Sequence, residues 1–469
     1  MRALEWLEHA ANGTLVEIGN YFEVPDYPTG PEPITIVFSE SRDTFAKVWA
    51  NVNTNSGILE LTSLEKPIAK LIVQRIMNLK NEELLHSEWG DFVNASIKDK
   101  VIGIWMIFER PIVLPPWQAP RTWKELIDAA KTQGKDIRRL IGNVSRKIRD
   151  GTQHIALLGF PIPDKIGSKP LQLYWQALLL PVLSHKNFSA PGFRANEIGY
   201  QMRDRKLLSG SEPVDWQKCE NWNSEEIACR GRYSSELTTS RVVIIGAGSL
   251  GSMMSELLVR GSVHQLTIVD KEILEAGNLV RHTLGLEDVG LAKATCLKKH
   301  LLKILPYAKV REIANNLEDI DDNDKEKLRE ADIIIDCTAN DEVIHYCGGF
   351  VWGGEKLFCS VSVGFKAKRL YLFIARKKAF PNVIFLDLMK EWLEKEIDDM
   401  CGMELPRAGT GCWHPAFPAR VDDMWLAAST ALKYLDEHMK IQHDRTKFAV
   451  FEQIKENEKF CGIKLIFEK

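Results

Sequence analysis

The C-terminal half of the chain alternates short apolar runs with amphipathic segments. The segment 249–261 follows the first run and carries Met253, Met254, Leu257 and Leu258 on one helical face. Uninterrupted apolar runs rich in β-branched residues are typical of buried parallel strands, and they occur here at 241–248, 264–270, 309–316 and 331–338. Strands that alternate with helices predict an α/β fold, a doubly wound, mainly parallel sheet of the Rossmann-like kind.

The N-terminal half has a mixed pattern that predicts a separate α/β domain. Strands are expected at 33–39, 101–109 and 151–161, and helices within 62–86 and 121–150. A polar stretch without helical or strand periodicity follows this half. We therefore expect three parts: an N-terminal domain over 1–207, a linker over 208–235, and a C-terminal domain over 236–469.

Composition narrows the class of protein. The chain has 469 residues with 45% hydrophobic content and a net charge of −3, which gives no reason to expect nucleic acid or an anionic membrane as a partner. No apolar run reaches the length of roughly 18 residues that spans a bilayer. Nine scattered cysteines without a CxxC pair favour a reducing, cytoplasmic compartment.

A glycine-rich turn, GAGSLG, joins the first strand to the first helix of the C-terminal half. Gly246 permits a tight turn, Gly248 lets the backbone approach a phosphate, and Gly251 lets the helix pack close to the strand. Asp270 ends the next strand, where a carboxylate can hold a ribose hydroxyl. These residues predict a nucleotide site, and they suit NAD and ATP equally well.

Three residues downstream favour ATP over a nicotinamide dinucleotide. Asn278, Arg281 and Lys293 follow Asp270. An enzyme that splits ATP between its α and β phosphates must neutralise several negative charges in the transition state and on the leaving pyrophosphate. A guanidinium and an ammonium supply that charge, whereas a dehydrogenase has no obvious need for them.

The combined pattern resembles the ThiF/MoeB/E1 superfamily, whose members adenylate the C-terminal glycine of ubiquitin-like proteins with ATP. The resemblance covers roughly 236–430 and rests on GAGSLG, Asp270, NLVR (278–281) and GLAKA (290–294). It implies that Asp270 holds the ribose and that Asn278, Arg281 and Lys293 contact the phosphates. It also implies Mg²⁺ as a cofactor and a homodimer as the usual assembly.

One position departs from the pattern of that superfamily. The family has Asp in a C-T-D-N motif, where the carboxylate serves Mg²⁺ and the adenylate, and this chain has Ala339 there. Asp336 and Asp341 flank the gap, and either can supply the carboxylate, most simply Asp341 from the start of the next helix. The alternative is a weakened or lost adenylation activity.

A second chemical site is expected near 395–420. The segment GCWHP resembles the catalytic-cysteine segment of bacterial E1-like proteins from operons of ubiquitin-like conjugation, a resemblance that implies antiviral defence. Cys412 is the expected nucleophile, with Cys401 as the alternative, because a thioester-forming cysteine sits in an exposed segment where nearby Arg407 and His414 favour the thiolate. The resemblance implies two partners, a ubiquitin-like protein and an E2-like protein.

Several functions remain open at this point. The favoured one is an E1-like enzyme that forms an adenylate and then a thioester. The alternatives are an adenylating enzyme that serves sulfur transfer, an NAD-dependent oxidoreductase, and a non-catalytic binding module. The first cysteine of the chain is Cys219, so an N-terminal domain of E2-like or inactive adenylation-like type would lack a catalytic cysteine.

Overall fold

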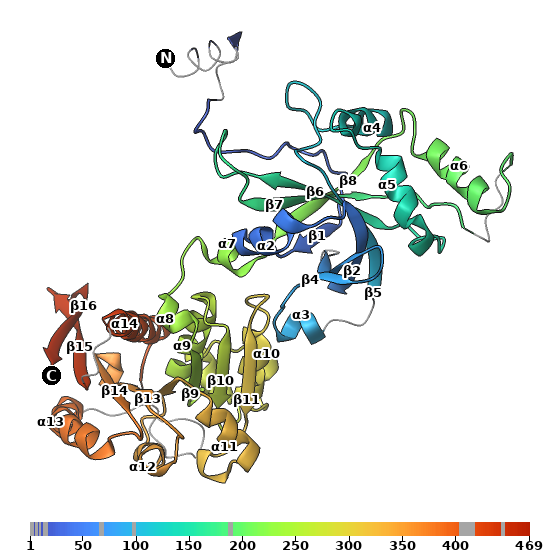
Figure 1. Ribbon diagram of the computed structural model, residues 1–469. Coiled ribbons are helices and arrows are strands. Elements are labelled where there is room, and N and C mark those ends of the chain that lie inside the picture. Colours follow the sequence, from blue (N-terminus) through green and yellow to red (C-terminus); the bar gives the residue numbers. More distant parts are fainter. Residues whose placement is uncertain are drawn as a thin grey trace. The chain divides into compact units, whose positions relative to one another are not determined.

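The chain folds into two compact units (Figure 1). A computed structural model describes residues 4, 8, 11–12, 17–64, 70–95, 100–185, 191–402, 418–441 and 446–469. One unit consists of Met1–Glu88 and Val93–Ile227, and the other of Trp89–Phe92 and Ala228–Lys469.

The first unit is built on a mixed sheet that closes on itself. The strand order is β1-β8-β7-β6-β5-β2-β3-β4, and an additional parallel pairing joins β1 at one end to β3, the strand before the other end. The prediction of a mixed α/β N-terminal domain is therefore confirmed. The strands are β1 (Thr35–Phe38), β2 (Ser56–Leu64), β3 (Lys70–Asn78), β4 (Glu83–His86), β5 (Lys100–Ile107), β6 (Ile155–Ile162), β7 (Gln172–Leu179) and β8 (Asp215–Asn221).

The segment 62–86 corrects one expectation from the sequence. A helix was expected there, but the described part of the segment forms the end of β2 and the strands β3 and β4. Ile72, Val73 and Ile76 are buried on β3, and β-branched side chains pack well in a sheet. Pairing with β1, β2 and β4 outweighs the local helical pattern.

The predicted linker is also shorter than expected. Residues 215–221 form β8, which pairs with β1 and β7 inside the first unit. Trp216 and Gln217 of this strand are buried although its sequence, DWQKCEN, is mostly polar. Gln217 donates its amide to the Asp215 carboxylate and accepts from the Ile34 N–H, so its polar atoms are satisfied without water.

Two apolar clusters fill the first unit, one around Trp123, Leu126 and Ile141 and the other around Trp105 and Trp175. Its helices begin at clear caps; Thr122, for example, forms a capping box with Glu125. Its helical segments are α2 (Arg42–Lys47), η1 (Trp49–Asn51), α4 (Trp123–Lys131), α5 (Ile137–Val144), η2 (Ser145–Lys147) and α6 (Glu197–Leu207). Two further helices, α3 (Asp91–Ala95) and α7 (Ser224–Ala228), contain residues assigned to both units.

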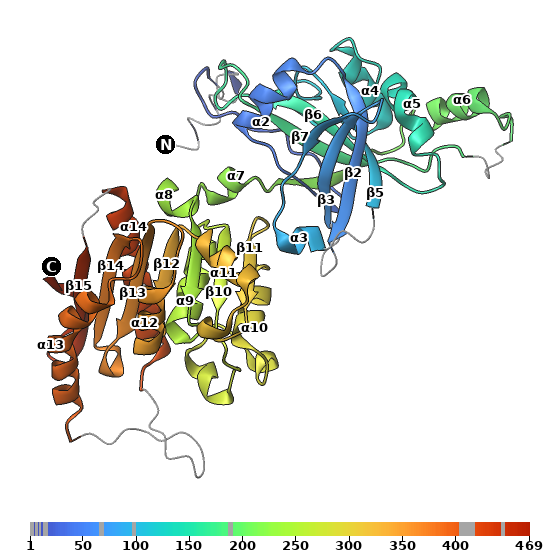
Figure 2. The ribbon, with the colours of Figure 1, turned by 60° about the horizontal axis from the view of Figure 1, so that its bottom comes forward.

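The second unit is the predicted doubly wound domain. Its strand order is β11-β10-β9-β12-β13-β14-β15-β16, which Figure 2 shows across the face of the sheet. The pairings from β11 to β13 are parallel and those from β13 to β16 are antiparallel. The strands are β9 (Arg241–Ile245), β10 (Gln265–Val269), β11 (Lys309–Ile313), β12 (Ile333–Asp336), β13 (Lys356–Val363), β14 (Arg369–Lys377), β15 (Lys447–Glu456) and β16 (Lys459–Glu468).

Helices cover both faces of this sheet. Val242 and Ile244 of β9 belong to the core with α9, α10 and α14, whereas Val243 and Ile245 belong to the core with α12 and α13. A strand buried on both faces needs the continuous apolar run seen in the sequence. The helical segments are α8 (Ser235–Thr238), α9 (Ser249–Arg260), η3 (Ala276–Arg281), η4 (Leu286–Asp288), α10 (Lys293–Leu301), η5 (Leu317–Asp319), α11 (Asp322–Arg329), α12 (Asp341–Gly349), η6 (Phe365–Ala367), α13 (Asn382–Met400) and α14 (Val421–Lys440).

Long helices of the second unit are amphipathic rather than uniformly apolar. Across the described residues, no helix combines the length and the hydrophobicity that a bilayer crossing requires.

Candidate nucleotide and carboxylate site

The order of the strands creates a crevice at the carboxyl ends of β9 and β12. The chain runs from β9 outward to β10 and β11, then returns to the other side of β9 to form β12. Such a reversal of strand order is where doubly wound sheets bind their ligands. The residues that follow β9 and β12 meet there, since the Cys337 N–H donates to the Ile245 carbonyl at 2.8 Å.

The three glycines of the turn have different structural roles. Gly246 has a φ of +92°, and a Cβ there would lie 2.9 Å from Thr338 Cγ2. A Cβ on Gly251 would lie 1.8 Å from the Gly246 carbonyl oxygen, so only glycine lets α9 pack this closely. Gly248 is the N-cap of α9, and a Cβ there would meet open space. The backbone at Gly248 is thus accessible, at a helix N-terminus that favours anions.

Asp270 fixes the glycine turn to the next strand. One carboxylate oxygen accepts the Ala247 N–H at 2.6 Å, and the other accepts the Glu272 N–H at 2.6 Å. Burial raises the pKa of Asp270, while these two backbone N–H groups lower it. The side chain predicted to hold the ribose therefore also shapes the glycine turn.

Lys293, at the start of α10, is held by a residue that sequence reasoning missed. Its ammonium lies 2.6 Å from the Glu272 carboxylate and its backbone N–H donates to the Glu272 carbonyl at 2.9 Å. The Lys293 side chain is only 6% exposed, so the charge is directed inward rather than into solvent. Glu272 stands two residues after Asp270 and belongs to no sequence motif that would have indicated this contact.

His282 is a second residue that sequence reasoning missed. Its Nδ1 accepts the Leu284 N–H at 3.1 Å, so Nε2 carries the proton and donates to the Ala247 carbonyl at 2.7 Å. Burial lowers the pKa of His282, and the Lys293 ammonium lowers it further. This neutral imidazole connects the segment that carries Arg281 to the glycine turn.

Asn278 and Arg281 lie on η3, the short helix after β10. The Asn278 side chain accepts the Glu275 N–H at 3.0 Å, which closes the first turn of η3. Both residues are half-buried. The fold therefore brings Asn278, Arg281 and Lys293 to the same end of the sheet as the glycine turn.

Two neighbouring cavities lie at this end of the sheet. The first, of about 210 Å³, is lined by the glycine turn, Asp270, Glu272 and Thr338. The second, of about 350 Å³, is lined by Asp341, Phe365, Phe385 and Met389 among others. Asn340 lines both cavities, so they adjoin at the start of α12. Asn278, Arg281 and Lys293 are outside the described lining of the first cavity.

The two candidate metal carboxylates have different environments. Asp336 is buried; one of its oxygens accepts from the Thr338 N–H and hydroxyl, and the other accepts from the Ser360 hydroxyl at 3.0 Å. Burial raises the pKa of Asp336. Asp341 is exposed in the first turn of α12 and lines the second cavity. Asp336 lines the same cavity, so both carboxylates face it; Asp341 is the exposed one, and Asp336 is buried and also holds the loop.

Ala339 adopts a conformation that suits the residue it replaces. Its φ is +51°, a left-handed value that Asp and Asn tolerate better than Ala. The Asn340 side chain next to it caps α12 by accepting the Glu342 N–H at 2.9 Å. The backbone thus retains a shape that would accommodate Asp at position 339.

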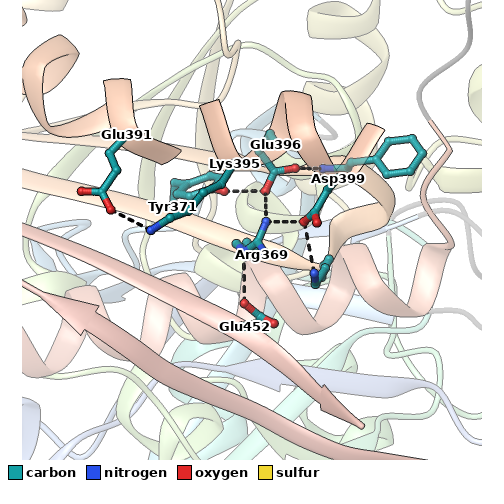
Figure 3. A network of polar contacts seen from close by, with 9 residues as sticks. Arg369, Tyr371, Glu391, Lys395, Glu396, Asp399 and Glu452 are labelled. Atoms are coloured by element: carbon teal, nitrogen blue, oxygen red, sulfur yellow. Dashed lines mark hydrogen bonds and ion pairs between the residues drawn. The ribbon is translucent and has the colours of Figure 1, made fainter. Parts of the chain in front are cut away.

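A network of charged residues fastens α13 to the sheet (Figure 3). Arg369 of β14 lies 2.8 Å from Glu396 and 2.7 Å from Asp399, both on α13, and 3.0 Å from Glu452 of β15. Glu396 also accepts from the Tyr371 hydroxyl at 2.5 Å. These contacts fix the end of α13 beside the second cavity, which Tyr371 and Glu396 both line.

The cysteines divide into buried and exposed groups. Cys296, Cys347 and Cys359 are buried and Cys337 is half-buried. Cys401 is exposed directly after α13. Cys412, together with Arg407 and His414, falls outside the described residues.

Comparison with known proteins identifies the family. Residues 224–380 match the ThiF family, and residues 13–222 match the Cap2 central linker domain. The ATP-dependent ubiquitin transferase-like protein Cap2 of Enterobacter hormaechei subsp. hoffmannii is 34% identical over 440 residues, which cover 92% of this chain and 72% of that relative. The chain belongs to the Cap2 family.

Other relatives share only part of the chain. A probable molybdopterin-synthase adenylyltransferase of Porphyra purpurea is 34% identical over 137 residues, which cover 26% of this chain and 35% of that protein. Among solved structures, E. coli MccB with ATP aligns with 18% identity and a TM-score of 0.34, over 49% of this chain and 64% of MccB. The chain thus spans less than two thirds of both proteins.

Membership of the Cap2 family confirms the resemblance drawn from GAGSLG, NLVR and GLAKA. The chain is an E1-like adenylyltransferase of the ThiF type, and its use of ATP follows from that class. The match of residues 13–222 to a Cap2 linker domain names neither of the two alternatives, E2-like or inactive adenylation-like, that the sequence left open for the first unit.

Proposed function

We propose that this protein uses Mg·ATP to adenylate the C-terminal carboxyl group of a ubiquitin-like protein and then receives it as a thioester on Cys412. A carboxylate oxygen of the ubiquitin-like protein attacks the α phosphorus of ATP, the bond to the β phosphate breaks, and pyrophosphate leaves. The Cys412 thiolate then attacks the acyl carbon, and AMP leaves. An E2-like protein then takes the acyl group from Cys412 by thioester exchange, and the Cys412 thiolate is the leaving group.

The observation that carries this proposal is the pair of adjoining cavities. The smaller one is bounded by the glycine turn and Asp270, as a nucleotide site requires, and the larger one opens beside it at Asn340. We assign the larger cavity to the C-terminal segment of the ubiquitin-like protein. This arrangement brings an incoming carboxylate to the edge of the phosphate site, where adenylation takes place.

Each site residue has a distinct role in the proposal. Gly248 and the N-terminus of α9 bind phosphate through backbone N–H groups, and Asp270 holds the ribose. Lys293 and Arg281 neutralise the charge that develops as pyrophosphate leaves, and Asn278 orients the phosphate edge.

Asp341 is the residue we assign to Mg²⁺. A magnesium ion that is bound largely by nucleotide phosphates needs only one or two protein carboxylates. Both Asp341 and Asp336 line the larger cavity, but the Asp341 carboxylate is exposed, whereas Asp336 is buried and both of its oxygens already accept hydrogen bonds. The ion, when bound, offsets phosphate charge.

Thioester formation separates this proposal from adenylation alone. The chain is incubated with ATP, Mg²⁺ and its ubiquitin-like protein and analysed on non-reducing gels. We expect an adduct that dithiothreitol removes, that is lost in Cys412→Ser and that persists in Cys401→Ser. An adenylate without any adduct would favour the sulfur-transfer function named for relatives such as the molybdopterin-synthase adenylyltransferase. We also propose that the chain forms a homodimer, as the resemblance to the superfamily implies, and sedimentation of the same chain tests this.

A further inference from the structure

The first unit contains a cavity lined by arginines, far along the sequence from the nucleotide site. It has a volume of about 210 Å³ and lies between α5, η2 and α6. The helices α5 and α6 lie side by side in both ribbon views (Figures 1 and 2), and Arg149 joins them through ion pairs to Glu197 and Asp204. Four arginines line the cavity: Arg138, Arg139, Arg149 and Arg205.

Positive charge exceeds negative charge around this cavity. Asp204 is the acidic residue of its described lining, and it is already held by Arg149 at 2.9 Å and by the Ser184 N–H at 2.8 Å. Glu197, beside the cavity, is shared by Arg149 at 2.8 Å and Arg146 at 3.5 Å. Arg139 and Arg205 are exposed and, within the described chain, have no carboxylate partner.

Two guanidinium groups of the cavity lack acceptors for their Nε–H groups. The Nε atoms of Arg138 and Arg149 are buried and have no hydrogen-bond partner among the described residues. The nearest carboxylate oxygen to Arg138 Nε belongs to Asp136, at 3.6 Å, which is too long for a hydrogen bond. The Arg149 side chain is only 8% exposed, so water does not readily reach its Nε–H group to accept the hydrogen bond. A buried N–H without an acceptor is costly, and oxygens of a bound ligand would remove that cost.

We propose that this cavity binds a phosphoryl group. Guanidinium groups match the oxygens of phosphate through paired hydrogen bonds, and a dianion offsets more of the excess charge than a single carboxylate does. With a volume of about 210 Å³, the cavity has room for one such group among its four arginines. The site is separate from the proposed ATP site and gives the first unit a binding function.

Calorimetric titration of the full chain with inorganic phosphate tests the proposal. We expect saturable binding that weakens at least tenfold in Arg139→Ala/Arg205→Ala. These two side chains are exposed, so their loss leaves the packing of the unit intact. The matched control is Arg42→Ala/Arg121→Ala, which removes two exposed arginines elsewhere in the same unit and should leave the affinity unchanged.

A further titration, with AMP in place of inorganic phosphate, identifies the source of the phosphoryl group. AMP that binds tighter than inorganic phosphate, with the same dependence on Arg139 and Arg205, would indicate a phosphoryl group carried on a nucleoside; equal affinity would indicate a free anion. The proposal is overturned by acetate binding as tightly as phosphate, by equal phosphate affinity in Arg139→Ala/Arg205→Ala and wild type, or by binding that Lys293→Ala abolishes. Failure of ATP turnover alone would overturn the proposed function and leave this site intact.

Discussion

The ammonium of Lys293 lies 2.6 Å from the carboxylate of Glu272, and the Lys293 side chain is only 6% exposed. This pair places a positive charge next to the cavity that Asp270 and the glycine turn form. It also holds the start of α10, because the backbone of Lys293 donates to the backbone of Glu272. Glu272, which lines the cavity, therefore holds the Lys293 ammonium in one place.

Removing this cation should slow adenylation far more than it weakens folding. We expect Lys293→Ala to lower the rate of carrier-dependent ATP–pyrophosphate exchange by about 10²–10³-fold, the usual effect of losing one group that stabilises transition-state charge. Lys299→Ala, an exposed lysine on the same helix, is the matched control and should retain the wild-type rate. Equal exchange rates in Lys293→Ala and Lys299→Ala would show that Lys293 takes no part in adenylation.

Ala339 stands where the superfamily has Asp, so a carboxylate restored at this position should rescue the loss of another one nearby. We expect Asp341→Ala to lower the exchange rate about tenfold or more, because it removes the carboxylate assigned to the metal. Ala339→Asp should restore activity in that background, since the φ of +51° at this position tolerates Asp. Asp322→Ala, whose side chain is 98% exposed on α11, is the control. Full activity of Asp341→Ala would show that Asp341 does not serve the metal.

The network around Arg369 should dominate the stability of the second unit. Arg369→Met leaves Glu396, Asp399 and Glu452 close together without their shared cation. Breaking a buried charge pair costs about 3–5 kcal/mol, and we expect the free energy of unfolding in urea to fall by about that amount. Arg311→Met removes an exposed partner of Glu330 and should cost about 1 kcal/mol or less. A loss below 1 kcal/mol for Arg369→Met would contradict this account.

Glu40 should make the first unit less stable as pH rises. Burial raises the pKa of Glu40 from 4.5 to about 8, although the indole N–H groups of Trp175 and Trp49, at 2.8 and 2.9 Å, lower it. The folded unit keeps this proton between pH 4.5 and 8, where the unfolded chain has lost it, so the stability that Glu40 contributes is fully present below pH 4.5 and is lost as the pH rises to 8. The melting temperature should decline from pH 5 to 8 in wild type and stay nearly level in Glu40→Gln. A parallel decline in both proteins would contradict the raised pKa.

The sequence revealed the parts of the fold that depend on local pattern. The apolar run before Gly246 predicted a strand buried on both faces, and the spacing of Gly246, Gly248 and Gly251 predicted the turn. The segments 62–86 and 215–221 were misassigned because distant strands decide their structure. Trp216 and Gln217 are buried by partners far along the chain, and a polar strand of this kind has no apolar alternation to reveal it.

The candidate site was predictable to a similar extent. Asp270 could be identified because strand ends carry ligand residues in this kind of fold. Glu272 and His282 could not, since their importance depends on contacts with Lys293 and Ala247 that only the folded chain creates. The difference between Asp336 and Asp341 likewise depends on Ser360, which comes from a neighbouring strand.

Carrier-dependent exchange of labelled pyrophosphate into ATP tests the central claim most directly. The account predicts exchange only when the ubiquitin-like protein with a free C-terminal carboxyl group is present. It also predicts that exchange persists in Cys412→Ser, because the adenylate forms before the thioester, and that Lys293→Ala slows it by about 10²–10³-fold. Absence of exchange with the carrier present, or exchange that does not depend on the carrier, would contradict the account.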